Sequence, residues 1–176
     1  SKLIYPATRL QIIKDACEVC GVPMGTTSFD GDDYIVKEKP DTEELTFRQI
    51  LVWTAQIGCQ WARCDEYGRL CIGWYNLNPT EEESGKIMRT NGLTVNLEDV
   101  VITGIRVKEY VASETEETTV KTYLAGEEGY VLEISENQMI AEGEAESIAQ
   151  MIGKRCIGMS FRPFAVSCLT DLSLEA

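Results

Sequence analysis

The segment Thr46-Phe47-Arg48-Gln49-Ile50-Leu51 repeats an earlier segment, Thr8-Arg9-Leu10-Gln11-Ile12-Ile13, and this pair decides the predicted fold of the first half. Similar residue types continue to match further along, where Ala16, Cys17 and Val19 correspond to Thr54, Ala55 and Ile57. A repeat with a period of about 40 residues is typical of one supersecondary unit used twice. We therefore expect a duplicated unit within residues 1–78.

Each copy begins with a Thr that suits an N-cap and continues with apolar residues at helical spacing. This pattern predicts helices over residues 8–20 and 46–58, which end at Gly21 and Gly58 because glycine readily adopts the left-handed C-cap conformation. The side chains expected to face the core are Leu10, Ile13, Cys17 and Cys20 in the first helix and Phe47, Ile50, Leu51 and Thr54 in the second.

Short strands are expected after each helix. Asp30-Gly31-Asp32-Asp33 is typical of a turn and leads into a strand over residues 34–37. The same aspartates do not follow the calcium-loop pattern, since Gly falls at the wrong position and the terminal Glu is missing. After the second helix, residues 60–64 and 69–75 flank the turn Asp65-Glu66-Tyr67-Gly68 and predict a hairpin. The expected unit is a helix followed by a β-hairpin, used twice.

The second half is predicted to consist mainly of strands. Residues 78–86 are polar and contain Pro79 and Gly85, which indicates a linker. Residues 100–110, 118–124 and 130–134 favour strands of a meander, and residues 162–169 favour a last strand that joins the same sheet. The predicted fold class is α+β: a duplicated helix-hairpin domain over 1–78, a linker and lead-in over 79–99, and a partly barrel-like β-meander domain with one helix over 100–176.

One helix is expected within the second half, over residues 143–156. Its predicted apolar stripe consists of Ala145, Ile148, Ala149, Met151 and Ile152. Acidic residues (Glu142, Glu144 and Glu146) stand near its start and basic ones (Lys154 and Arg155) near its end, which suits the direction of the helix dipole.

The chain is strongly acidic, with a net charge of −13, and therefore we expect no specific nucleic-acid binding. From Glu109 to Glu146 there are eleven Glu and no Asp, against the single basic residue Lys121. Two interpretations stay open: a solvated face that keeps the domain soluble, or a wall that repels nucleic acid or meets a basic partner. No stretch is apolar enough to cross a bilayer.

No residue of the sequence is assigned to catalysis, to a cofactor or to a metal. The chain has no histidine, which removes the usual nucleophilic triads and the commonest zinc ligand. Phosphate-binding glycine loops are also missing. The seven cysteines are expected to be free thiols, and Cys17-Glu18-Val19-Cys20 is interpreted as a helical segment with one or both thiols against the core. We therefore expect no enzyme.

Aromatic residues leave an alternative open. Trp53, Trp61 and Trp74 with Tyr67 and Tyr75 could share a small core or form a platform on which sugars stack. A solvent-exposed cleft lined by two of these rings would favour a carbohydrate- or receptor-binding module. A hydrolase using two carboxylates about 5–10 Å apart in a pocket is a further alternative.

Several stretches resemble phage and prophage tail structural proteins of Gram-positive hosts. They are residues 46–51 with 55–59, residues 62–70, Tyr123-Leu124-Ala125-Gly126-Glu127-Glu128-Gly129-Tyr130, and Phe161-Arg162-Pro163-Phe164-Ala165-Val166-Ser167. The resemblance covers most of the chain. It implies part of a baseplate hub or tail-tip protein, in which small barrel domains build a trimeric ring and inserted α/β domains decorate it.

The resemblance also implies partners and a location. The partners would be other tail proteins and copies of the chain itself, as a trimer in the assembly, and the protein would be made in the bacterial cytoplasm and reside in the virion tail. The chain starts at Ser1 and stops at Ala176 without a recognisable natural end, so we expect a segment of a larger protein. A ring that DNA passes through would benefit from an acidic lumen, which would give the Glu-rich stretch a role.

Overall fold

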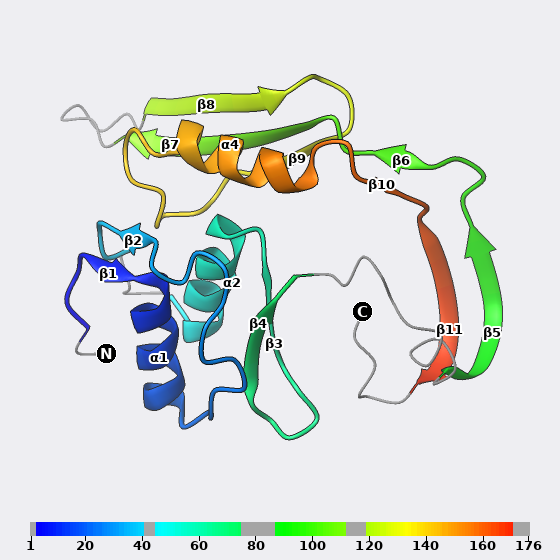
Figure 1. Cartoon of the computed structure of the whole chain (residues 1–176), viewed down its shortest axis with the longest axis horizontal. Helices are drawn as coiled ribbons and strands as arrows, with labels where there is room; N and C mark the ends of the chain where they lie inside the picture. The colour runs from blue at the N-terminus through cyan, green and yellow to red at the C-terminus, as the bar shows by residue number, and fades with distance from the viewer. Residues whose placement is uncertain (1–2, 41–44, 75–86, 112–118, 171–176) are drawn as a thin grey trace.

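The computed structural model describes residues 3–40, 45–74, 87–111 and 119–170. Its fold class is α+β, as expected. Figure 1 shows two helices, α1 (Arg9–Cys20) and α2 (Phe47–Ile57), next to a three-stranded sheet that is covered by a third helix, α4 (Ala145–Cys156). A two-stranded ribbon of β5 (Ile87–Val95) and β11 (Phe164–Thr170) stands off to one side. The described strands form five small sheets and none of these closes into a barrel, so the barrel-like part of the expectation is not confirmed.

The two predicted helices are present as α1 (Arg9–Cys20) and α2 (Phe47–Ile57). Thr8 and Gln11 form a reciprocal capping box at the start of α1, and Thr46 caps α2 through its side chain. Gly21 has φ 66°, the expected left-handed C-cap. Gly58 instead has φ −90°, and Cys59, with φ 52°, takes the left-handed position. The left-handed conformation was predicted at Gly58, and it occurs one residue later, at Cys59.

The core-facing side of α1 is also broader than predicted. Ile12 packs into the main core, whereas Ile13 and Cys17 pack into a second, smaller cluster with the hairpin. Because the helix contacts two clusters, its buried residues are Arg9, Ile12, Ile13, Ala16 and Cys17. Cys20, which was predicted to face the core, is exposed. In α2 the fully buried residues are Trp53, Thr54, Ala55 and Ile57. Of the predicted core residues in α2, only Thr54 is fully buried.

Strand pairing differs between the two copies of the repeat. In the second copy β3 (Trp61–Cys64) and β4 (Leu70–Gly73) form the predicted hairpin, with Gly68 at φ 73° in the turn. In the first copy β2 (Ile35–Val36) pairs with β1 (Ala7–Thr8), which precedes the helix. The prediction of a hairpin after each helix is therefore wrong for the first copy. The backbone N–H of Arg9 donates to Tyr34 O at 2.9 Å and holds this pairing in place.

The three-stranded sheet is not a meander. It consists of β7 (Gly104–Val111), β8 (Thr119–Gly126) and β9 (Val131–Ile134) in the order β8-β7-β9, and β9 runs parallel to β7. The connection from β8 crosses beside Thr103, which lies just before β7. Gly126 and Gly129 have positive φ, and a Cβ atom on either glycine would collide with Thr103. These glycines make the crossover possible.

Helix α4 (Ala145–Cys156) packs on one face of this sheet. Ile148, Ala149, Ile152 and Cys156 are buried, whereas Met151 is 40% exposed, so Met151 is not part of the core-facing stripe as predicted. The acidic and basic residues at its two ends lie as expected. The main core joins both halves of the chain, since residues such as Trp53 and Ile57 belong to the same cluster as Val107 and Ile148.

Four strands lie beyond this body. β6 (Val100–Val101) pairs with β10 (Ser160–Phe161), and β5 (Ile87–Val95) pairs with β11 (Phe164–Thr170). The last strand therefore joins β5, and the prediction that it joins the sheet of β7 is wrong. β5 occupies residues that the sequence assigned to the linker and lead-in. Residues 79–86 of the predicted linker and lead-in lie outside the described residues.

Candidate functional site

The described residues contain neither a helix that could span a membrane nor a cluster of metal ligands. No helix in the described ranges is long and apolar enough to cross a membrane. The described His, Cys, Asp and Glu side chains form no group of three or more that is placed to hold a metal ion. Asp32 lies in the predicted turn, where its carboxylate accepts a hydrogen bond from Ser28 Oγ at 3.0 Å. Cys17 is buried and Cys20 is exposed, which agrees with the interpretation of one thiol against the core.

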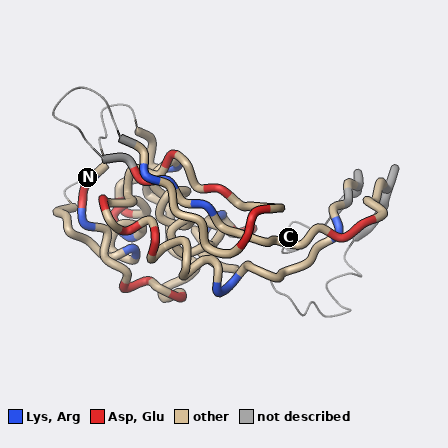
Figure 2. The backbone as a smooth tube through the Cα atoms, turned by 90° about the horizontal axis from the view of Figure 1, so that it is seen from above, with Lys and Arg blue, Asp and Glu red and all other residues tan. Residues whose placement is uncertain are grey.

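Much of the described acidic stretch is paired with basic side chains. Glu144 contacts Lys37 Nζ at 2.7 Å and accepts a hydrogen bond from Tyr34 Oη at 2.6 Å, while Glu142 contacts Lys121 Nζ at 2.9 Å. Burial and the hydrogen bond to Glu144 raise the pKa of Tyr34. Figure 2 shows basic and acidic positions interspersed over the body. The interpretation of a bare acidic wall is therefore not favoured for these residues.

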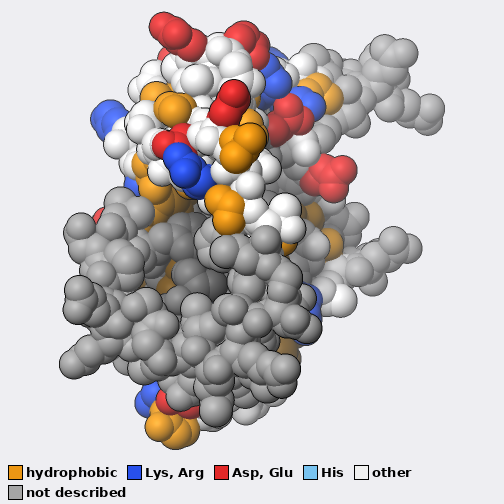
Figure 3. All heavy atoms as spheres, turned by 90° about the vertical axis from the view of Figure 1, so that its right-hand side faces the viewer, with side chains coloured by type: hydrophobic (Ala, Val, Ile, Leu, Met, Phe, Trp, Pro, Cys, Tyr) orange, Lys and Arg blue, Asp and Glu red, His pale blue; other side chains and the backbone are white. Residues whose placement is uncertain are grey.

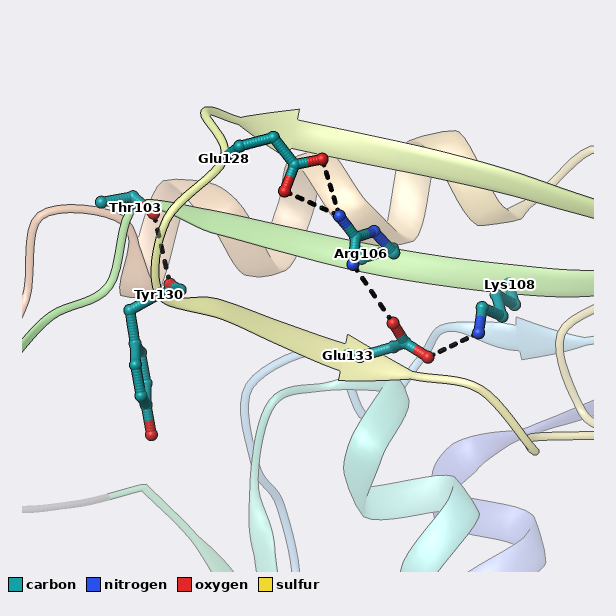
Figure 4. A network of polar contacts seen from close by, with 6 residues as sticks. All are labelled: Thr103, Arg106, Lys108, Glu128, Tyr130 and Glu133. Carbon is teal, nitrogen blue, oxygen red and sulfur yellow. Dashed lines mark hydrogen bonds and ion pairs between the residues drawn. The ribbon is translucent and has the colours of Figure 1, made fainter.

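The face of the sheet that points away from α4 carries a charged network (Figure 4). Arg106 forms two hydrogen bonds to the Glu128 carboxylate, at 2.7 and 2.8 Å, and a longer one to Glu133 at 3.4 Å. Lys108 Nζ contacts the other Glu133 oxygen at 2.6 Å. The hydrogen bond from Lys108 lowers the pKa of Glu133. The network joins β7, β9 and the turn between β8 and β9, and it makes this face polar.

Glu109 is the exception, because its carboxylate is completely buried. Its Oε2 accepts hydrogen bonds from the backbone N–H groups of Gly143 and Ala145, at 3.0 and 3.1 Å. Its Oε1 has no hydrogen-bond partner among the described residues. A carboxylate at the start of α4 satisfies free N–H groups and interacts favourably with the helix dipole. Both interpretations of the Glu-rich stretch place its side chains at a surface, and the buried position of Glu109 on the inner face of β7 fits neither of them.

Two of the predicted aromatic residues line one cavity. Trp61 and Trp74 border a space of about 220 Å³ together with apolar side chains of β7, β9 and α4. The Trp61 ring already has two neighbours: the Arg63 guanidinium lies 4.3 Å from the ring centroid, and Gly73 packs so closely that a Cβ atom would overlap the ring. Trp53 is buried in the core and Tyr67 lies exposed at the hairpin turn. Tyr75 lies outside the described residues. The Arg155 guanidinium lies 5.6 Å from the centroid of the Trp74 ring, so both rings that border the cavity already pack against a cation. The geometry therefore favours packing over a platform for sugars.

The strongest candidate for a functional surface lies at the base of the β5–β11 ribbon. We define the ribbon-base patch as the exposed apolar side chains of Val95, Leu97, Tyr130 and Phe161. Leu97 is 94% exposed, and Tyr130 and Phe161 pack edge to face with their ring centroids 5.9 Å apart. In the view of Figure 3, exposed hydrophobic side chains lie interspersed with charged and polar ones on the upper part of the molecule.

The ribbon continues this surface outward. β5 and β11 pair with each other, and no other described strand pairs with either of them. Each therefore keeps one edge without a strand partner among the described residues, and such an edge can accept a strand of another chain. The predictions from sequence did not include this surface. The sequence pattern that could have predicted it is Leu97, an apolar residue between the polar Asn96 and the acidic Glu98-Asp99.

Comparison of the chain with protein-family models and with curated proteins found no match in either case.

Proposed function

We propose that this chain is a structural segment of a phage or prophage tail baseplate hub or tail-tip protein, and that it acts through protein–protein contacts in an oligomeric ring. The observation that carries the proposal is the β5–β11 ribbon, which stands off the body next to the ribbon-base patch. An isolated two-stranded ribbon is marginally stable in water, and exposed apolar patches commonly mark interaction sites. A neighbouring subunit would supply the missing packing.

The resemblance to tail proteins supplies the kind of partner. One of the resembling stretches includes the glycine crossover between β8 and β9, with Tyr130 of the ribbon-base patch. Another runs from Phe161, at the end of β10, into β11. In this proposal the partners are copies of the chain, as a trimer, and other tail proteins. The chain is made in the bacterial cytoplasm, is carried in the virion tail and performs no catalysis.

The test is a pair of charge substitutions in the protein expressed from its intact gene together with neighbouring genes. Leu97→Asp places a charge in the ribbon-base patch and is expected to abolish assembly, as measured by mass photometry and electron microscopy. Ile4→Asp is the matched control, because Ile4 is also an exposed apolar side chain, at 83%, and lies near the N-terminal end of the described residues. This variant should assemble normally.

Two results would overturn the proposal. One is a gene neighbourhood without tape-measure and tail-tube genes. The other is a wild-type protein that forms no ring or tail complex with the neighbouring gene products. A specific, saturable interaction with cell-wall saccharide in place of assembly would favour the receptor-binding alternative.

A further inference from the structure

Two cysteines from different halves of the chain meet at the junction of α2 and α4. Cys59 Sγ and Cys156 Sγ lie 3.1 Å apart, although the residues are 97 positions apart in sequence. Sulfur atoms joined in a disulfide lie about 2.05 Å apart, so a shift of about 1 Å would bring these two into bonding distance. Both are free thiols in the structure.

The surrounding contacts hold the two residues in this position. Arg155, which precedes Cys156, donates a hydrogen bond from Nη1 to the carbonyl of Gly58, which precedes Cys59, at 3.0 Å. Arg155 also forms an ion pair with Asp30. Cys59 is the only non-glycine residue with a positive φ among the described residues, and this backbone conformation accompanies its approach to Cys156. Neighbouring residues of both segments are therefore clamped together.

The two thiols differ in their access to solvent. Cys156 is fully buried at the end of α4, whereas Cys59 is partly buried and borders two cavities, of about 220 and 140 Å³. A small oxidant can therefore approach Cys59 more readily than Cys156. No other pair of described cysteines has its sulfur atoms in hydrogen-bonding contact.

We propose that Cys59 and Cys156 are a disulfide-forming pair, which a small-molecule disulfide such as oxidised glutathione converts into a covalent link between the two halves of the core. The Cys59 thiolate attacks one sulfur of the oxidant, forms a mixed disulfide and releases the first thiol. The Cys156 thiolate then attacks Cys59 Sγ and expels the second thiol. The two cysteines lose two electrons and two protons, and the oxidant gains both as two thiols.

The environment of Cys59 sets the rate of this reaction. Burial, together with the contact to Cys156, raises the pKa of the Cys59 thiol, and only the thiolate is nucleophilic. Oxidation is therefore slow near neutral pH and faster at alkaline pH. The cytoplasm keeps thiols reduced, so the bond does not form while the protein is inside the host. If the chain has the proposed function, the bond forms after assembly, in the particle released from the host.

The test is to oxidise the full chain with oxidised glutathione and map its disulfides by mass spectrometry. Trypsin leaves residues 49–63 with Cys59 as the sole cysteine, and additional cleavage by chymotrypsin after Phe161 separates Cys156 from Cys168. The expected result is a linked peptide pair containing Cys59 and Cys156. The oxidised chain should also melt about 5–10 °C higher than the reduced chain.

Three variants make the result decisive. Cys59→Ser and Cys156→Ala should lose both the linked peptides and the rise in Tm, whereas Cys20→Ser should keep them, because Cys20 is exposed and borders neither of the cavities that Cys59 lines. If Cys156→Ala does not fold, Cys59→Ser and the wild-type map still decide the question. Modification of the exposed thiols without any Cys59–Cys156 link, at neutral and at alkaline pH, would overturn the proposal. This outcome is independent of ring assembly, so the two proposals can fail separately.

Discussion

The guanidinium of Arg9 occupies the space in which a side chain at Gly58 would lie. Arg9 reaches this position from the first turn of α1. It donates hydrogen bonds to Thr54 O at 2.9 Å, to Gly31 O at 3.1 Å and to Gln60 Oε1 at 2.6 Å. Burial, followed by the nearby Arg155, lowers the pKa of Arg9 to about 10. A single buried side chain thus joins α1, the loop before β2 and the end of α2.

Gly58→Ala is expected to lower the free energy of unfolding by about 2–4 kcal/mol, because the new methyl group displaces a buried, hydrogen-bonded guanidinium. The φ of −90° at Gly58 suits alanine, so this cost is steric. Gly21→Ala is the control: it has φ 66° with no neighbour within 4 Å, and should cost about 1 kcal/mol through its backbone alone. Urea denaturation measures both. In an Arg9→Met background the effect of Gly58→Ala should largely disappear, and an undiminished effect there would contradict the explanation.

Glu109→Gln is expected to change stability by no more than about 1 kcal/mol, because an amide oxygen can still accept from Gly143 and Ala145. Glu109→Leu removes this acceptor and should cost about 2–3 kcal/mol. Chemical denaturation of the two variants separates the hydrogen-bond acceptor from the charge. Equal losses for both would show that the negative charge at the start of α4 is what matters.

Lys108→Met is expected to raise the pKa of Glu133 towards its ordinary value. In the native protein the hydrogen bond from Lys108 is the largest cause of the lowered pKa, and Arg106 adds to it. A carboxylate with a lowered pKa stabilises the fold above its ordinary pKa, and this contribution is lost as the pH falls through the lowered value. Titration of the Glu133 carboxyl carbon by NMR measures the shift, with Lys14→Met as the control. An unchanged Glu133 titration in Lys108→Met would rule out this contact as the cause.

Trp61 and Trp74 provide a test of the carbohydrate alternative. Because Arg63 and Gly73 already pack on the Trp61 ring and Arg155 lies over the Trp74 ring, adding soluble cell-wall oligosaccharides should leave the indole N–H signals of both tryptophans unchanged in NMR spectra. The Trp74→Ala variant identifies the Trp74 signal. Saturable shifts of either indole signal would support that alternative.

Features set by neighbouring residues could be predicted from the sequence. Thr8 and Thr46 cap helices through residues three positions ahead, and Asp65 and Gly68 define a turn within one hairpin. Such interactions need no knowledge of the remaining chain. The sequence therefore predicts the helices, the second hairpin and the order of charges along α4 correctly.

Features set by distant residues could not be predicted in this way. β2 pairs with β1 rather than with a following strand, β9 lies on the far side of β7 from β8, and β11 pairs with β5. Each pairing depends on which partner lies near in three dimensions. The burial of Glu109 and the contact between Cys59 and Cys156 result from the same packing. No local pattern around these residues indicates either feature.

The shared core has a consequence for how the protein loses its structure. Trp53 and Ile57 from the first half and Val107 and Ile148 from the second half exclude water from one another. Neither half would keep a complete hydrophobic interior by itself, so both are expected to unfold in one cooperative transition. A chain nicked by a protease between residues 75 and 86 should remain a non-covalent pair of fragments that melts as a unit.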